Sequence, residues 1–306
     1  MTNDQEVLLS TLTPSGAPST SKLDTAAWFD GTHPNTERSP IDEFVENLYA
    51  INRLYLGADS TGEYVAILGS LAYLGMVSAA ESYFRSLLRR LILIDSVCAA
   101  NASSRMVTYG AAVHHDANLL PEALLENASF ASKKNVASEL KNLCSVTKMT
   151  KEGGVPPQLE PLFENFESIC QIRHCGIHRF GKLGSQQALK LGISTHGSLL
   201  EKPLKLSVNQ LQDIAEALEA LIRGVNSYCF NDIIRRTHTA GPGTRDKQSY
   251  AESWQMDFDA DFERFSRYYS IFSAGDGPLK SPSIEETYKA FLAFVKDHDS
   301  KPSKRP

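Results

Sequence analysis

The segment from residue 173 to residue 181 carries the residue types best suited to chemistry in this sequence. It reads Arg173-His174-Cys175-Gly176-Ile177-His178-Arg179-Phe180-Gly181, so two arginines and two histidines fall within seven residues. A guanidinium binds phosphate oxygens through two parallel hydrogen bonds. An imidazole accepts or releases a proton near neutral pH. Together these groups favour chemistry on a phosphate ester.

The spacing of Arg173 and His178 limits how they can act together. They are five positions apart, which places their side chains about 140° apart around an unbroken α-helix. They reach one ligand only if the helix ends or distorts between them, and Gly176 permits a distortion. We therefore expect the cations to project where the backbone turns. The simpler alternative is that Arg173 and Arg179 are C-terminal cations favoured by the helix dipole, with surface histidines beside them.

Glu81 is a further candidate because its carboxylate lies on or beside the apolar stripe of a predicted helix. Its neighbours at helical spacing are apolar, namely Val77, Phe84 and Leu88. An unpaired carboxylate is costly in such a place. The functional interpretation is that Glu81 orients Arg173 or His178. The alternative is an ordinary ion pair with Arg85, four residues further along the helix.

A zinc cluster is the main alternative for the same segment. The four candidate ligands, Cys170, His174, Cys175 and His178, lie within nine residues. Zinc sites usually combine ligand pairs from two separated segments, and no second pair is evident. We therefore expect no metal here.

Two other clusters are weaker candidates. The run Asp257-x-Asp259-x-Asp261 begins like a calcium loop, but Phe262 and Tyr268 stand where such a loop has glycine and glutamate. We expect a solvated helix start there. His114-His115-Asp116 could touch RNA, although a surface loop is the simpler interpretation. No GxxxxGK[ST] or GxGxxG motif is present, so we expect no bound cofactor.

Helices must position these residues, because apolar residues recur every three or four positions and no useful alternating pattern is found. The predicted helices begin near residues 40, 63, 132, 159, 207, 257 and 283. The helix over 63–99 is the strongest and is expected to kink near Gly75. Residues 101–122 and the stretch after Gly184 are expected to be irregular. The fold class is therefore all-α, a helical bundle with a C-terminal helical extension.

The composition and the breaks rich in glycine and proline predict the domain boundaries and the cellular compartment. Residues 1–40 are expected to be a flexible lead-in, 41–239 a helical domain and 244–306 the extension. The net charge of −5 argues against a protein that coats nucleic acid, so any RNA contact must be local. Five cysteines without a repeating spacing and a start without a leader pattern favour reduced thiols in the cytoplasm. The longest apolar stretch is too short to span a membrane.

The Arg-x4-His arrangement of Arg173 and His178 resembles the signature of HEPN domains, the higher eukaryotes and prokaryotes nucleotide-binding domains. The polar His174 after the arginine and Ile177 before the second histidine fit this pattern. The surrounding helices, residues 77–89 with Glu81 and the segments 120–125 and 129–132 extend the similarity over roughly residues 41–236. A HEPN-like helical bundle is therefore expected.

The resemblance implies a metal-independent endoribonuclease of the kind found in toxins, anti-phage effectors and RNA processing. Arg173 would bind the scissile phosphate, and His178 would handle protons, with His174 and Glu81 completing the site. The products would carry a 2′,3′-cyclic phosphate and a 5′-OH. The other expected RNA-binding cations are Arg179, Lys182 and Arg85. The alternatives are a non-catalytic HEPN module that binds RNA or nucleotide or serves in dimerisation, and a helical scaffold with a fortuitous motif.

The resemblance also implies partners. HEPN domains are typically homodimers with a shared cleft, and two copies of His178 would provide both a base and an acid. An antitoxin or a sensor is a further expected partner. Some relatives carry His-x-Tyr, in which the tyrosine is adenylylated by an antitoxin, but Phe180 occupies that position in this sequence.

Overall fold

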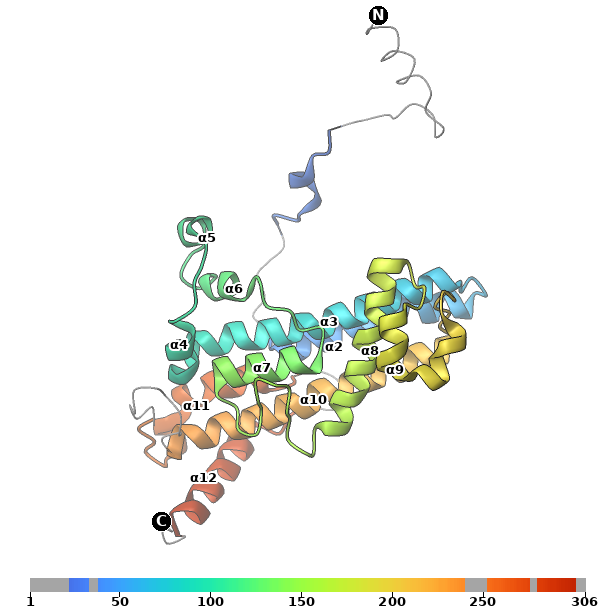
Figure 1. Ribbon diagram of the computed structural model, residues 1–306. Coiled ribbons are helices and arrows are strands. Elements are labelled where there is room, and N and C mark those ends of the chain that lie inside the picture. Colours follow the sequence, from blue (N-terminus) through green and yellow to red (C-terminus); the bar gives the residue numbers. More distant parts are fainter. Residues whose placement is uncertain (1–21, 33–37, 240–251, 276–279, 301–306) are drawn as a thin grey trace, which may run out of the picture. The chain divides into compact units, whose positions relative to one another are not determined.

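A computed structural model describes residues 22–32, 38–239, 252–275 and 280–300 (Figure 1). Every regular element in these ranges is a helix, which confirms the all-α prediction. The chain divides into two units, Met1–Glu37 and Arg38–Pro306. The first unit has one described element, the 3-10 helix η1 (Thr25–Trp28). Most of the lead-in that the sequence predicts to be flexible, residues 1–40, lies outside the described residues. No helix among the described residues is long and apolar enough to cross a membrane.

Four long helices build the second unit. They are α2 (Pro40–Ser60), α3 (Ala66–Ile94), α8 (Glu160–Arg179) and α10 (Val208–Thr239). The central helix α3 contacts the other three. Aromatic side chains fill the centre, where Phe84 of α3 stacks or tilts against Phe130 and Phe166. Burial of these rings supplies much of the hydrophobic stabilisation.

Side-chain caps fix several predicted helix starts. Ser132 accepts a hydrogen bond from the Asn135 N–H and begins α7 (Lys133–Cys144). Ser207 and Gln210 cap each other's backbone N–H groups at the start of α10. Because such caps depend on neighbours within three residues, the sequence predicts them correctly.

The predicted helix over 63–99 is two helices. Helix α3 continues through Gly75 and ends at Ile94, so the expected kink is replaced by a break at Asp95. Asp95 accepts a hydrogen bond from the Cys98 N–H and begins α4 (Ser96–Ala102). A Cβ on Gly75 would lie 3.1 Å from the Ile51 Cδ1 atom of α2. Gly75 therefore allows the two helices to approach closely instead of bending α3.

Short helices occupy regions that the sequence predicts to be irregular. They are α5 (Tyr109–His114), α6 (Leu120–Leu125), α9 (Ser185–His196) and the 3-10 helix η2 (Gly197–Leu199). Helix α9 buries only Ala188, and Gly192 inside it has a φ of 104°. A helix with so small a buried face leaves little periodicity in the sequence. Helices α8 and α9 lie together at one end of the bundle (Figure 1).

The expected C-terminal extension forms α11 (Phe258–Phe272) and α12 (Ile284–Ser300). Both helices contact α10, and α11 also contacts α2 and α3, so the extension shares the hydrophobic core. The predicted boundary near residues 240–243 lies outside the described residues. Helix α11 begins where it is expected, and Asp257 caps it by accepting a hydrogen bond from the Ala260 N–H. Asp261 is fully buried and accepts hydrogen bonds from two backbone N–H groups and Tyr288. The expectation of a solvated acidic run is therefore wrong for Asp261.

Candidate functional site

Helix α8 carries Arg173, His174 and His178 on an unbroken backbone. It continues through Gly176 to Arg179 and ends where Phe180 adopts a left-handed conformation, with a φ of 51°. The distortion predicted at Gly176 is therefore wrong. A Cβ at Gly176 would lie 3.0 Å from the Leu74 Cδ2 atom, so this glycine allows α8 to pack closely on α3. At five positions along an intact helix, Arg173 and His178 leave α8 in directions about 140° apart.

Glu81 of α3 holds the guanidinium of Arg173. Its Oε2 atom lies 3.0 Å from the Arg173 Nη2 atom, and the two side chains are 21% and 23% exposed. Glu81 thus pairs with Arg173, whereas Arg85 pairs with Glu122, so the alternative pair with Arg85 is not formed. Burial raises the pKa of the Glu81 carboxyl, and the positive charges of Arg173 and Arg85 oppose that shift. The ion pair therefore fixes the direction of the guanidinium on a partly desolvated surface.

Arg85 is engaged elsewhere. Its guanidinium donates to the carbonyl oxygens of Leu125 at 2.6 Å and Ala128 at 3.1 Å. It also lies 5.7 Å from the ring centroid of Phe130. Arg85 thus holds the end of α6 and the residues that follow it against α3 through hydrogen bonds. Its predicted contact with RNA stays a prediction and would require these bonds to be shared or broken.

His174 and His178 lie on the same side of α8, one turn apart. Their ring centroids are 6.0 Å apart and the ring planes differ by 17°. His174 is half-buried, whereas His178 is exposed. Burial lowers the pKa of His174, and the nearby charges of Arg173, His178 and Lys190 lower it further. His174 therefore favours the neutral imidazole, which is able to accept a proton.

Arg173 and His174 line a groove of about 600 Å³, which we name the α7–α8 groove. Three lysines that the sequence pattern does not single out also line it: Lys133 and Lys134 in the first turn of α7 and Lys190 of α9. The N-terminus of a helix attracts anions through its dipole and its free N–H groups. The groove thus combines an arginine, an imidazole, three ammonium groups and a helix N-terminus with the carboxylates of Glu152 and Glu167. The excess of positive groups favours binding of an anion.

Carboxylates balance part of this positive charge. Glu167 accepts a hydrogen bond from the Lys133 N–H at 2.9 Å and one from the Gln171 side chain at 2.6 Å. Lys133 also pairs with Glu160. A phosphate that entered the groove would compete with Glu167 for the first turn of α7.

The remaining predicted RNA-binding cations lie outside the lining of the groove. Arg179 forms an exposed ion pair with Glu201, with 2.5 Å between the Nη2 and Oε1 atoms. Lys182 is exposed, and its backbone forms an isolated antiparallel β-bridge with Pro203. Arg179 is the last residue of α8, and Lys182 follows three positions further along the chain.

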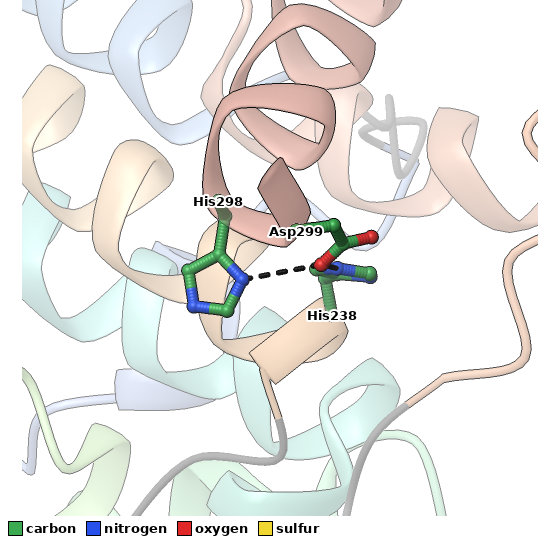
Figure 2. Close-up of side chains that lie close together, drawn as sticks. All are labelled: His238, His298 and Asp299. Carbon is green, nitrogen blue, oxygen red and sulfur yellow. Dashed lines mark hydrogen bonds and ion pairs between the residues drawn. The ribbon is translucent and has the colours of Figure 1, made fainter. Parts of the chain in front are cut away.

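The structure does not assemble the zinc cluster that the sequence offers as an alternative. Cys170 and Cys175 are buried, and burial raises the pKa of Cys170. The Cys175 Sγ atom contacts the Gln171 carbonyl oxygen of its own helix. His114-His115-Asp116 is exposed at the end of α5, as expected for a surface segment. Across the described ranges, one group of three potential ligands gathers, formed by His238, His298 and Asp299 (Figure 2).

Comparison with known proteins provides no family for this chain. No family model, curated protein or solved structure matches it. The resemblance of residues 173–181 to HEPN domains therefore stays a prediction. The assignment of function depends on the residues and their geometry.

We expect His174 to titrate below its ordinary pKa of 6.5. Because its folded pKa is lowered, protonation as the pH falls through this range opposes folding, and the imidazole is neutral at pH 7. NMR titration of the ring protons measures this directly. Lys190→Ala removes one of the charges that repel protonated His174, so it should raise the pH midpoint of the His174 titration. Lys289→Ala on α12 should leave that midpoint unchanged. A midpoint above 6.5 in the native protein would contradict the expected environment.

Proposed function

We propose that this protein is a metal-independent endoribonuclease that binds its scissile phosphate at Arg173. The observation that carries the proposal is the α7–α8 groove, in which Arg173 and His174 meet Lys133, Lys134 and Lys190. Arginine, lysine and a helix N-terminus bind phosphates, and neutral imidazoles move protons. RNA cleavage by its own 2′-OH requires these two functions and no metal ion.

The chemistry assigns one task to each group. Arg173, held by Glu81, binds the phosphate and stabilises the negative charge that develops on the phosphorane. The ribose 2′-oxygen attacks phosphorus while a neutral imidazole accepts its proton, and the bond from phosphorus to the 5′-oxygen breaks. A protonated imidazole returns a proton to that 5′-oxygen. The products carry a 2′,3′-cyclic phosphate and a 5′-OH. His178 handles protons, and His174 lies beside it as a second imidazole.

Incubation of the purified full chain with total RNA in EDTA tests the proposal. We expect cleavage to continue in EDTA, and end analysis should show 2′,3′-cyclic phosphate. A substrate with deoxyribose at the cut position should resist cleavage, because it lacks the nucleophile. No cleavage in EDTA together with cleavage restored by added Mg²⁺ would refute the mechanism.

We further expect a homodimer that brings two copies of this site together. Arg173 and His178 diverge around an intact α8, so two protomers are needed to place a His178 opposite an Arg173. Large apolar side chains are exposed at the end of α8 and on α9: Ile177, Phe180, Leu189 and Ile193. Their burial against a second copy would stabilise association. A two-fold axis would make this surface face itself.

Light scattering at micromolar concentration should show a dimer, and Ile177→Glu should shift it toward monomer. Met106→Glu is a matched control, because Met106 is 94% exposed on the segment between α4 and α5. It should leave the dimer unchanged. A monomer that cleaves RNA at full rate would exclude a site composed of two protomers.

A further inference from the structure

The ends of α10 and α12 bring two histidines and an aspartate together (Figure 2). His238 lies in the last turn of α10, and His298 and Asp299 lie in the last turn of α12. The Oδ1 atom of Asp299 is 3.0 Å from the His238 Nε2 atom and 3.3 Å from the His298 Nδ1 atom. One carboxylate oxygen thus faces a ring nitrogen from each of two helices.

These distances are close to those of a metal site. Zinc binds imidazole nitrogen and carboxylate oxygen at about 2.0–2.2 Å, which separates neighbouring ligand atoms of a tetrahedron by about 3.4 Å. One potential ligand atom from each of the three residues lies within 4.8 Å of the other two. An ion could therefore be accommodated with small rotations of the side chains.

The surroundings restrict His238, whereas the side chains of His298 and Asp299 are 51% and 57% exposed. The ring of His238 is 17% exposed, and its centroid lies 5.9 Å from that of His298. The His298 ring also contacts the Phe294 ring. The Arg235 guanidinium lies 4.8 Å from the centroid of the Phe294 ring.

We propose that His238, His298 and Asp299 form a binding site for a divalent transition-metal ion of the zinc class. Two imidazoles and one carboxylate favour Zn²⁺, Co²⁺ or Ni²⁺ over Mg²⁺ and Ca²⁺, which prefer oxygen ligands. Three protein ligands leave a fourth position for water or another group. The ion joins the end of α12 to the end of α10 and so fastens the C-terminal helix to the bundle.

The site is separate from the proposed nuclease site. It lies at the end of α10 that is opposite α8 and α9 (Figure 1). None of its residues lines the α7–α8 groove. The proposed RNA chemistry therefore does not depend on this ion, and each proposal can fail without the other.

Titration of the metal-free full chain with ZnCl₂ tests the proposal. Calorimetry should show one Zn²⁺ per chain at this site, and the midpoint of thermal unfolding should rise with Zn²⁺ concentration because the ion binds the folded state. His238→Ala and His298→Ala should each weaken binding at least tenfold. MgCl₂ should produce neither effect. Co²⁺ should give the visible absorption bands of a four-coordinate ion.

The chain offers matched controls. His115→Ala removes a histidine from an exposed His-His-Asp sequence whose groups do not gather. His178→Ala removes one of two histidines that are one turn apart on α8. Both variants should bind Zn²⁺ with the affinity of the native protein, whereas His238→Ala should bind it at least tenfold more weakly. Asp299→Asn tests the carboxylate if a histidine variant unfolds. Equal Zn²⁺ affinity in the native protein, His238→Ala and Asp299→Asn would overturn the proposal, as would binding lost only in His178→Ala.

Discussion

Replacing His178 or Arg173 by alanine is expected to abolish RNA cleavage. Loss of positioned proton transfer at His178 should lower the rate by roughly 10²–10⁴. Loss of Arg173 should have a similar effect, because its guanidinium is the charged group in the groove that the partly buried Glu81 holds in place. Arg173→Lys should recover only part of the rate, since lysine lacks the planar fork that binds two phosphate oxygens. Single-turnover cleavage of a labelled RNA measures each rate.

Controls must separate chemistry from folding in this experiment. His115→Ala should cleave at the native rate, because His115 is exposed at the end of α5 and the proposed mechanism assigns it no task. Arg173→Ala leaves Glu81 without its ion pair, which destabilises the fold. The double variant Arg173→Ala/Glu81→Gln removes that charge and should recover stability without recovering cleavage. Native cleavage by His178→Ala would refute the assignment of the site.

The sequence predicts those features that depend on neighbouring residues. The starts of α7, α10 and α12 follow from Ser132, Ser207 and Ser283, whose side chains accept N–H hydrogen bonds from within the first helical turn. The apolar surroundings of Glu81 likewise indicate that it needs a partner. Its partner is 92 positions away in the chain, and only the resemblance to HEPN domains favours Arg173 over Arg85 before the fold is known.

The groove could not be predicted from sequence because three separate elements build it. In the sequence, Lys133 and Lys134 indicate only a helix start, and Lys190 lies in a helix with little periodicity. Their common position emerges when α7 and α9 pack against α8. Gly176 shows the same limit, since a glycine that breaks a helix and one that allows close packing look alike in a sequence.

Asp95→Ala is expected to destabilise the fold more than any other substitution proposed above. Its carboxylate is 2% exposed and lies 2.7 Å from the Arg236 guanidinium. It also caps α4 through the Cys98 N–H at 2.8 Å and accepts a bond from Tyr268 of α11 at 3.3 Å. Removal of Asp95 leaves the buried Arg236 guanidinium with its hydrogen bond to the Cys144 carbonyl oxygen but without the opposite charge of the carboxylate, which costs about 3–5 kcal/mol. Urea unfolding followed by circular dichroism measures this loss.

An exposed ion pair on one of the C-terminal helices is the matched control for Asp95. Glu263 and Arg267 of α11 are 86% and 58% exposed and form an i,i+4 pair. Glu263→Ala should change the free energy of unfolding by less than about 0.5 kcal/mol, because solvent screens such pairs. Asp95→Asn keeps an oxygen that can cap α4. Its loss of unfolding free energy should therefore lie between those of Asp95→Ala and Glu263→Ala. Asp95 joins the end of α3 to α4, α10 and α11, so a large loss would show that this buried network stabilises the bundle that positions Glu81. A loss below about 1 kcal/mol for Asp95→Ala would contradict this role.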